Sequence, residues 1–190
     1  MVYSVLRNIL SVLYRIIYRI EVEGEENVPK SGGAILCANH KSNNDGIILA
    51  IAQKRQITFM AKEELFKVPV LGAILRKVAA FPVKRGTGDI GAIRTAVDVL
   101  NKGNMLSIFP EGTRNKTKEP LAEFKAGAVL IAYKADALIV PCAISGRYIP
   151  FSKLKVSFGV PFKVEKTDKK PDLNLETSKL KENVFMLMNK

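Results

Sequence analysis

The sequence predicts an α/β fold in which helices flank a mainly parallel central sheet, with an amphipathic, membrane-anchoring helix at the N-terminus. Apolar runs typical of buried strands alternate with segments of helical periodicity, a pattern typical of a parallel sheet covered on both faces. With 190 residues, 47% of them hydrophobic and 25% charged, the chain can form one globular domain with a sizeable core. We expect an interfacial helix over residues 1–20 and a single α/β domain over residues 21–190.

A polar stripe at helical spacing runs along the first twenty residues and comprises Ser4, Arg7, Asn8, Ser11, Arg15 and Arg19. Two of these arginines interrupt the run of about 20 apolar residues that a membrane span requires. The segment Glu21-Val22-Glu23 lacks the small residues of a secretory cleavage site. The wide apolar face on the rest of the circumference favours a helix lying in a membrane interface. A helix packed on the body of the domain is the alternative.

Strands are expected where apolar residues form short continuous runs or, at 20–23, alternate with charged residues. Helices are expected where apolar residues recur every three or four positions, as in 90–102 before the helix stop Gly103. The expected strands are residues 20–23, 33–38, 57–61, 78–83, 105–109, 137–144 and 155–159. The expected helices are the one that ends near Gln53 and those at 70–77, 90–102, 126–134 and 175–189.

The net charge of +12 requires an anionic partner or surface, such as nucleic acid, anionic lipid or a phosphorylated substrate. The sequence contains no recognition-helix, zinc-finger or aromatic-basic RNA motif and no tryptophan, so nucleic acid is not predicted as a partner. Cys37 and Cys142 each lie inside an apolar run and are expected to be buried, reduced thiols. One histidine and two separated cysteines are too few soft ligands for zinc, so no metal is expected.

His40, the only histidine, lies in the polar segment Asn39–Gly46 between two apolar runs. A strand that ends in a polar turn and leads into a helix is where α/β proteins usually place active sites. Asp45 is close enough across the turn to hold the imidazole in one tautomer, as an orienting carboxylate does for a general base. Two other interpretations stay open: Asp45 caps the following helix, or His40 is a hydrogen-bonded turn residue.

Gly86–Gly91 matches the dinucleotide-binding pattern G-x-G-x-x-G between a predicted strand and a predicted helix, with Glu111 twenty residues further on. In dinucleotide-binding folds this strand usually begins the domain, whereas several elements precede it here. Lys84 and Arg85 are also unusual beside a buried first strand. A nucleotide-binding protein that uses Gly86–Gly91 is therefore an alternative, and a plain connecting loop is the simpler interpretation.

Basic residues follow three separate predicted strands, namely Lys62, Arg85 and Arg114. If these strands are parallel, their carboxyl ends share one edge of the sheet with His40. Cations that converge on one histidine–aspartate pair indicate an anionic, phosphate-like substrate brought to a base.

Four motifs carry a resemblance to a known family, and they occur in the order His40-x4-Asp45, Phe81–Arg85, Phe109–Arg114 and Ile139–Pro141. Together they resemble the glycerolipid acyltransferase family, most closely its bacterial 1-acyl-sn-glycerol-3-phosphate acyltransferases, over about residues 20–160. Lys41 stands where many members have Gln, and Lys84 where many have Asp. Both departures add a positive charge and remove no group that the chemistry of the family needs.

The resemblance implies an α/β acyltransferase domain at 21–190 that moves a fatty acyl group from a thioester to the sn-2 hydroxyl of 1-acyl-sn-glycerol-3-phosphate, giving phosphatidic acid. His40 would be the general base, and Asp45 would fix its tautomer. Glu111 would bind the glycerol hydroxyls or brace Arg114. The implied residues for the substrate phosphate and glycerol are Lys62, Arg85, Glu111, Gly112, Thr113 and Arg114.

No cofactor is expected, and an acyl-CoA or acyl-carrier-protein thioester would be the co-substrate. The expected partners are a membrane lipid substrate, an anionic membrane surface and, as one of the two donors, acyl carrier protein. This places the protein on the cytoplasmic face of the cell membrane, as a peripheral or monotopic protein. Another lysophospholipid or an amine as acceptor, and a non-enzymatic basic protein of membranes or nucleic acid, are the remaining alternatives.

Overall fold

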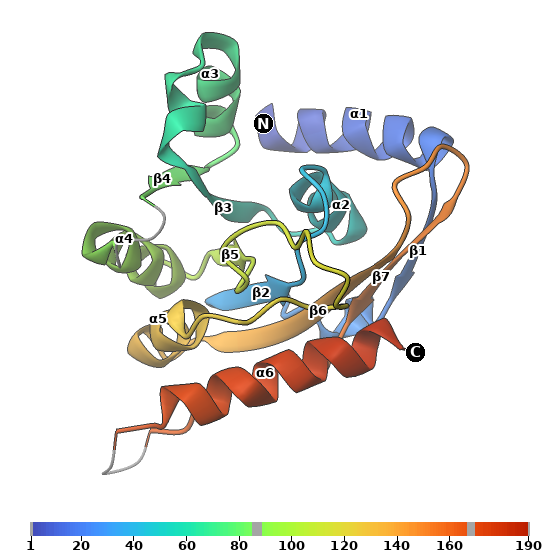
Figure 1. The fold of residues 1–190 in the computed structure, drawn as a ribbon. Coiled ribbons are helices and arrows are strands. Elements are labelled where there is room, and N and C mark those ends of the chain that lie inside the picture. Colours follow the sequence, from blue (N-terminus) through green and yellow to red (C-terminus); the bar gives the residue numbers. More distant parts are fainter. Residues whose placement is uncertain (1, 85–88, 167–169, 190) are drawn as a thin grey trace.

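The computed structural model describes residues 2–84, 89–166 and 170–189, and a seven-stranded sheet lies at its centre (Figure 1). The strands are β1 (Arg19–Glu23), β2 (Ala34–Ala38), β3 (Ile57–Lys62), β4 (Phe81–Val83), β5 (Met105–Ile108), β6 (Leu138–Gly146) and β7 (Lys153–Phe158). The α-helices are α1 (Val2–Ile17), α2 (Asp45–Ala52), α3 (Pro69–Lys77), α4 (Ile90–Asn101), α5 (Gly127–Ala135) and α6 (Leu173–Met188). Two 3-10 helices, η1 (Glu25–Asn27) and η2 (Glu63–Lys67), were not predicted.

The strand order is β1-β7-β6-β2-β5-β3-β4, and the five strands from β6 to β4 all run parallel. β7 pairs antiparallel with β6, because a short hairpin joins them, and β1 then pairs parallel with β7. The two strands at this edge therefore run opposite to the other five. This topology confirms the predicted α/β fold with a mainly parallel sheet.

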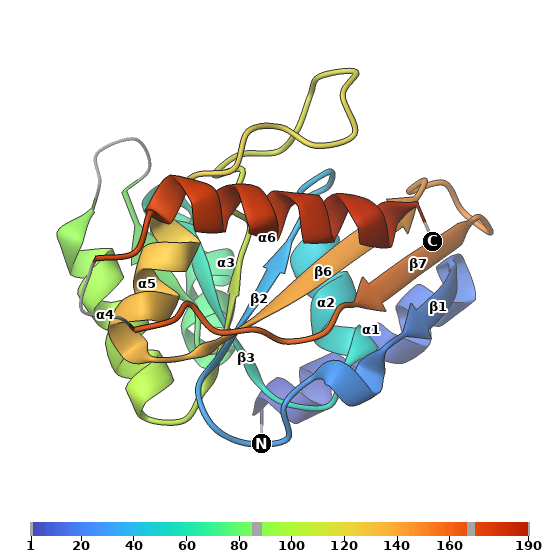
Figure 2. The same cartoon turned by 90° about the horizontal axis from the view of Figure 1, so that it is seen from below.

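Helices cover both faces of the sheet, with α1 and α2 on one face and α4, α5 and α6 on the other (Figures 1 and 2). In β2, Ala34, Leu36 and Ala38 belong to the core below α1 and α2. Ile35 and Cys37 belong to the core below the other helices. All five side chains are completely buried. This is why β2 reads as one continuous apolar run rather than an alternating pattern.

The two cysteines are free and buried, as predicted. Cys37 belongs to the core on one face of the sheet and Cys142 to the core on the other, so their side chains point apart. Burial raises the pKa of the Cys37 thiol and of the Cys142 thiol, because an apolar surrounding disfavours the thiolate. Neither thiol is placed to form a disulfide or to act as a nucleophile in the folded protein.

The predicted strand at 78–83 is shorter in the structure, where β4 begins only at Phe81. The three residues before it close the C-terminus of α3. Val78 N donates to Ile74 O at 3.0 Å, and Ala80 N donates to Leu75 O at 2.9 Å. Ala79 between them has a left-handed φ of 59°. Their apolar character reflects packing at the end of a helix, which the sequence pattern does not distinguish from a strand.

Helix α1 lies across α2, and several of its polar groups face the protein rather than the solvent (Figure 1). Arg7 Nε donates to Ala50 O at 3.0 Å and to Gln53 O at 3.1 Å, at the C-terminus of α2. The Tyr3 hydroxyl accepts a hydrogen bond from Ile57 N at 3.1 Å. The polar stripe predicted for this helix is therefore divided between the protein and the solvent.

The opposite side of α1 carries large apolar side chains that nothing within the described residues covers. Six of them are between 44% and 67% exposed, namely Val2, Val5, Ile9, Val12, Leu13 and Ile16. In residues 2–84, 89–166 and 170–189, no helix is both long enough and apolar enough to pass through a bilayer. The helix ends at Ile17, three residues earlier than expected, because the chain enters β1 at Arg19.

Candidate active site

His40 and Asp45 form a hydrogen-bonded pair between the end of β2 and the start of α2. His40 Nδ1 lies 2.7 Å from Asp45 Oδ2. Asp45 is completely buried, whereas His40 keeps 9% of its surface exposed. Because the carboxylate is the acceptor, Nδ1 carries the proton and Nε2 has the lone pair. Nε2 can therefore accept a proton from a substrate.

The turn between the two residues is built around the same carboxylate oxygen. Asp45 Oδ2 accepts hydrogen bonds from Lys41 N at 2.6 Å and from Ser42 N at 2.8 Å. The N-cap position of α2 is Asn44, whose side chain makes no capping bond. The interpretation of Asp45 as a helix cap is therefore wrong, since its side chain binds the preceding turn. Ser42 Oγ accepts from Asn44 N at 3.2 Å, which is a turn-capping role.

Phe109 and Asn115 hold His40 from the neighbouring segment after β5. The imidazole stacks on the Phe109 ring, with centroids 4.2 Å apart and planes 16° apart. Asn115 N donates to His40 O at 2.7 Å. One face of the imidazole is thus covered by an apolar ring, and its in-plane orientation is set by Asp45. Phe109 lies within one of the motifs identified in the sequence, but its contact with His40 was not predicted.

Glu111 supports the backbone of the site and is 3% exposed. Its Oε1 accepts from His40 N at 2.6 Å, and its Oε2 accepts from Ala122 N at 2.9 Å. Bracing Arg114, one of the two roles expected for Glu111, is not among the contacts of the described residues. Both carboxylate oxygens are used by backbone N–H groups, so Glu111 joins His40 to the loop that follows β5.

Two further contacts to the His40–Asp45 turn were not predicted from the sequence. The Asn39 side chain donates to Ile144 O at 3.0 Å and accepts from Ile144 N at 2.7 Å. The Tyr148 hydroxyl donates to Asp45 Oδ1 at 2.5 Å. Both partners lie more than a hundred residues away and meet the turn because β6 pairs with β2. Sequence spacing carries no signal for such contacts.

Two of the predicted cations, Lys62 and Arg114, follow strands that end at the same edge of the sheet as the strand before His40, because β2, β5 and β3 are parallel neighbours. Lys62 ends β3, and its ammonium pairs with Glu64 at 3.1 Å, both side chains being about half exposed. Thr113 and Arg114 are exposed in the segment after β5. Arg85, the remaining predicted cation, lies outside the described residues.

Gly112 occupies a position that only glycine adopts easily, with a φ of 72°. A Cβ atom at Gly112 would lie 3.1 Å from Lys125 Nζ, so the lysine side chain lies directly against this glycine. Lys125 N also donates to Pro110 O at 2.8 Å, which fixes its position beside the motif. Lys125 is thus a cation next to Gly112 that the sequence motifs did not include.

The Gly86–Gly91 loop is described only from Asp89 onward, so the first three residues of the pattern lie outside the described residues. Asp89 caps α4, with Oδ1 accepting from Ala92 N and Oδ2 from Lys84 N, each at 3.0 Å. The strand before the loop, β4, is the outermost in the sheet, whereas a dinucleotide lies at a switch point between inner strands. The sheet order therefore argues against the nucleotide-binding alternative.

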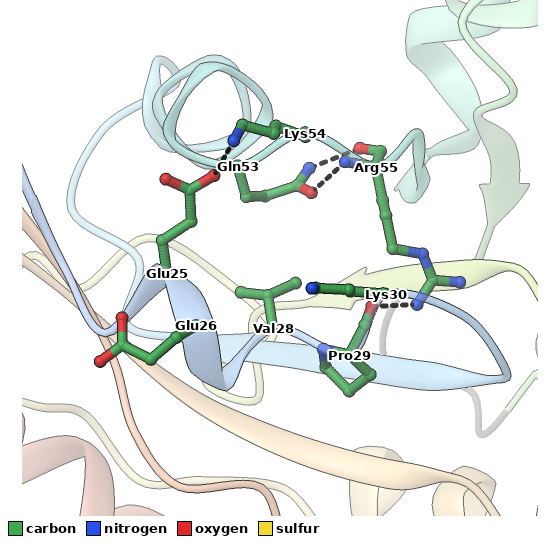
Figure 3. A pocket seen from close by; sticks show the side chains of 8 residues that line it. All are labelled: Glu25, Glu26, Val28, Pro29, Lys30, Gln53, Lys54 and Arg55. Atoms are coloured by element: carbon green, nitrogen blue, oxygen red, sulfur yellow. Dashed lines mark hydrogen bonds and ion pairs between the residues drawn. The ribbon is translucent and has the colours of Figure 1, made fainter.

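Two surface cavities of about 350 and 250 Å³ lie away from His40. Figure 3 shows the larger one, where residues before β2 and β3 line the opposite edge of the sheet. Arg55 there donates to the carbonyls of Pro29 and Gly32 at 2.7 and 2.8 Å, and Lys54 pairs with Glu25 at 3.8 Å. The charged side chains of Arg55 and Lys54 therefore bind neighbouring segments of the same chain. No cluster of three metal-ligating side chains occurs in the part of the chain that the structure describes.

The chain is similar to proteins of known function. The model of the family described as Acyltransferase matches residues 19–145. The 1-acyl-sn-glycerol-3-phosphate acyltransferase of Bacillus subtilis (strain 168) is 34% identical over 165 residues, which are 84% of this chain and 81% of that protein. The enzyme of the same description from Streptococcus pneumoniae is 31% identical over 186 residues, 93% of this chain and 69% of that protein.

A solved structure is also similar. The crystal structure of the 1-acyl-sn-glycerophosphate (LPA) acyltransferase PlsC from Thermotoga maritima superimposes with a TM-score of 0.73 at 26% sequence identity. The similarity covers 90% of this chain and 73% of that chain. The two proteins therefore share their fold over most of this chain.

Proposed function

Because the chain belongs to the Acyltransferase family, we propose that it moves a fatty acyl group from an acyl thioester to 1-acyl-sn-glycerol-3-phosphate, giving phosphatidic acid in phospholipid biosynthesis. The acceptor group is the sn-2 hydroxyl. The observation that carries the proposal is the His40–Asp45 pair, in which Nδ1 lies 2.7 Å from a buried carboxylate oxygen while His40 keeps 9% of its surface exposed. The similarity to the enzymes from Bacillus subtilis and Thermotoga maritima supports the choice of acceptor.

The reaction needs one proton to move twice. Neutral His40 takes the proton of the sn-2 hydroxyl at Nε2 while the hydroxyl oxygen attacks the thioester carbonyl carbon. The carbonyl then re-forms as the carbon–sulfur bond breaks, and the imidazolium returns the proton to the leaving thiolate. Asp45 stabilises the positive ring between the two steps and keeps Nε2 facing the substrate. The products are an ester and a thiol, and the acyl group passes directly without an acyl-enzyme.

Positioning supplies a large part of the rate. General-base catalysis alone typically contributes ~10²–10⁴-fold, so the hydroxyl and thioester must also be held in reacting geometry. The Phe109 stack and the Glu111 hydrogen bond hold His40 from two further directions. The turn after β2 and the segment after β5 therefore both hold His40 before any substrate binds.

We assign the substrate phosphate to the cations beyond the ends of β3 and β5. Arg114 is exposed, and a guanidinium can bind two phosphate oxygens at once. Lys62 forms an exposed ion pair with Glu64, which is weak enough to be exchanged for a phosphate. Lys125 adds a positive charge against Gly112. Arg85 belongs to this set by its motif.

The same proposal includes a bilayer as the source of the acceptor. The outward side of α1 is apolar, and the β6–β7 hairpin beside it exposes 53% of Ile149 and 73% of Phe151. Phe151 N donates to Ile17 O at 2.6 Å, which joins the hairpin to the end of α1. Figure 1 shows α1 and α3 on the same side of the molecule, and Val70 of α3 is 74% exposed. These apolar groups would lie in the interface of the cytoplasmic leaflet, as in a peripheral or monotopic protein.

The positive charge of the chain favours the same location. Each Lys or Arg near an anionic leaflet contributes ~1 kcal/mol of attraction, and the net charge is +12. Arg15 and Arg19 are exposed beside the apolar side of α1, where they can meet lipid headgroups. The donor would approach from the aqueous side as an acyl-CoA or as an acyl carrier protein.

A direct assay tests the proposal. The purified chain is mixed with 1-acyl-sn-glycerol-3-phosphate in mixed micelles and with either acyl-CoA or acyl-carrier-protein thioester, and the product is identified by mass. We expect phosphatidic acid with at least one donor, and its loss in His40→Ala. Folded His40→Ala with unchanged turnover overturns the role of His40. Product formation only from another lysophospholipid or an amine overturns the assigned acceptor.

A further inference from the structure

Asp45 is completely buried, and its two carboxylate oxygens are held in different ways. Oδ2 accepts hydrogen bonds from three donors of its own turn, His40 Nδ1, Lys41 N and Ser42 N. Oδ1 accepts from the Tyr148 hydroxyl at 2.5 Å, which reaches it from the segment after β6. Within residues 2–84, 89–166 and 170–189, Tyr148 is the one donor to Oδ1.

The Tyr148 hydroxyl is suited to remain a donor and unsuited to give up its proton. Burial raises the pKa of Tyr148, and the negative charge of Asp45 raises it further. Loss of the proton would place two negative oxygens in contact in a buried position. The hydroxyl therefore keeps its proton throughout the reaction, and its effect on the chemistry must pass through Asp45.

The effect of Tyr148 concerns the orientation of the Asp45 carboxylate. A carboxylate turns about its Cβ–Cγ bond with only a broad preference for any one angle. The three donors of the turn all bind Oδ2, so they restrain this rotation from one side of the bond. The hydrogen bond from Tyr148 holds Oδ1 on the other side of the bond and adds a second, independent restraint on the same rotation. With both oxygens held, Oδ2 stays in line with the Nδ1–H bond of His40.

Tyr148 is itself held by a row of aromatic rings that begins on α1. The ring of Tyr18 meets that of Tyr148 edge to face, with centroids 5.8 Å apart and planes 87° apart. Tyr14 lies against Tyr18 with centroids 5.9 Å apart. The Tyr14 hydroxyl in turn donates to Asn44 Oδ1 at 3.1 Å, next to Asp45 in the chain. Offset and edge contacts of this kind restrict each ring to one position.

We propose that Tyr148 is a positioning residue of the acyl transfer, which restrains rotation of the Asp45 carboxylate and thereby aligns His40 Nε2 with the acceptor hydroxyl. The inference rests on the proposed function, because it assigns His40 the role of general base. It adds a contact from the hairpin between β6 and β7 to a carboxylate whose other donors, among the described residues, all come from its own turn. It also connects α1, through Tyr14 and the following Tyr18, to the His40–Asp45 pair.

Tyr148→Phe in the full chain removes the hydroxyl and keeps the ring that packs on Tyr18. We expect kcat to fall about tenfold, with KM for the acceptor and for the donor within about twofold of the parent, since the hydroxyl that is removed is bound to Asp45. Tyr133→Phe on α5 removes a tyrosine hydroxyl remote from the turn and is the matched control, with kcat unchanged. A purely structural role predicts a lower concentration of folded enzyme at constant kcat, so kcat is expressed per folded molecule.

A double-mutant cycle separates action through Asp45 from an independent effect. In an Asp45→Asn background, Tyr148→Phe should lower kcat by less than about twofold, because the carboxylate that it positions is absent. If the two substitutions instead multiply to the product of their single effects, Tyr148 does not act through Asp45 and the proposal is overturned. The same holds if Tyr148→Phe alone leaves kcat at the parent value.

The single histidine provides a readout that needs no turnover. Nitrogen NMR of the imidazole reports His40 alone, because no other histidine is present. We expect the Nδ1–H signal to move in Tyr148→Phe and to stay in place in Tyr133→Phe. An unchanged signal overturns the proposal even if the parent proves inactive on lysophosphatidate. Inactivity of the parent with a moved signal overturns the proposed function and leaves the Tyr148–Asp45–His40 coupling established.

Discussion

The carboxylate of Glu111 accepts a hydrogen bond from the backbone N–H of His40 at 2.6 Å across 71 residues of sequence. Its second oxygen accepts from Ala122 N at 2.9 Å. One buried side chain therefore sets the distance between the His40–Asp45 turn and the loop that carries Arg114. Glu111 therefore acts by holding the backbone of the site in place. Replacing it with a neutral side chain of the same size tests this role.

Glu111→Gln should lower the free energy of unfolding by about 1–3 kcal/mol, because the new NH2 group would face a backbone N–H donor in a buried place. We expect kcat to fall as well, since His40 loses one support. Urea unfolding and steady-state kinetics measure the two effects. Glu119→Gln in the same loop is the control, because Glu119 is exposed and its substitution should change stability by less than about 0.5 kcal/mol. Equal stability of both variants would contradict the support assigned to Glu111.

Arg114→Ala should raise KM for 1-acyl-sn-glycerol-3-phosphate by about tenfold or more and change kcat much less, because a guanidinium–phosphate contact is present before and during reaction. Steady-state kinetics with varied acceptor concentration measures this. Arg94→Ala on α4, also exposed, is the control and should leave KM unchanged. The difference between Arg114→Ala and the parent should vanish with a monoacylglycerol acceptor that lacks the phosphate. A loss of kcat at constant KM would remove Arg114 from phosphate binding.

Ile9→Gln together with Ile16→Gln should weaken binding to vesicles of anionic lipid, because both side chains lie on the uncovered side of α1. Phe151→Gln should add to the loss. Sedimentation with phosphatidylglycerol vesicles measures the bound fraction. Deletion of the whole helix is a poorer test, since it would also remove Arg7 from the end of α2.

The control for the vesicle experiment is Val160→Gln, which replaces a side chain that is 76% exposed and lies after β7. It should leave binding unchanged. Vesicles of neutral lipid should bind the parent less strongly, and the difference should shrink at high salt as charges are screened. If the α1 variants sediment like the parent, α1 does not lie in the membrane.

The two thiols give a prediction for pH. Burial raises the pKa of the Cys37 thiol and of the Cys142 thiol, so both stay protonated in the folded protein above the ordinary value of about 8.5. The unfolded chain releases these protons there, so the stability that the thiols contribute is complete below about pH 8.5 and is lost as the pH rises further. The urea midpoint should fall above this pH, and less steeply in Cys37→Ala/Cys142→Ala. Iodoacetamide should label both thiols in urea and neither in the folded protein.

The parts of the fold that follow from the sequence are those with a local cause. β2 and β5 are apolar runs because helices cover both faces, and His40 and Asp45 meet because five residues of turn bring them together. Contacts that depend on the sheet were not predictable, since they require the pairing of β6 with β2 to be known first. Tyr148 on Asp45 and Asn39 on Ile144 belong to this class.

Helix α1 shows a second reason why part of the structure was not predictable from the sequence. Its apolar and polar positions were identified, but periodicity alone does not say which sector of a helix faces the protein. Arg7 belongs to the polar stripe and yet points inward, because the carbonyl groups at the end of α2 need a donor. The apolar sector is left outward as a result. The side of a helix that faces the protein depends on the element against which the helix packs, so it cannot be predicted from the sequence of the helix alone.

α1 binds α2 at both ends, through Tyr14 to Asn44 at the start and through Arg7 to Ala50 and Gln53 at the finish. If α1 detached, both ends of α2 would lose hydrogen-bond partners, and the core that Tyr18 helps to fill would open to water. Residues 1–20 are therefore not an appendage that melts on its own. A thermal scan should show a single cooperative transition for the whole chain.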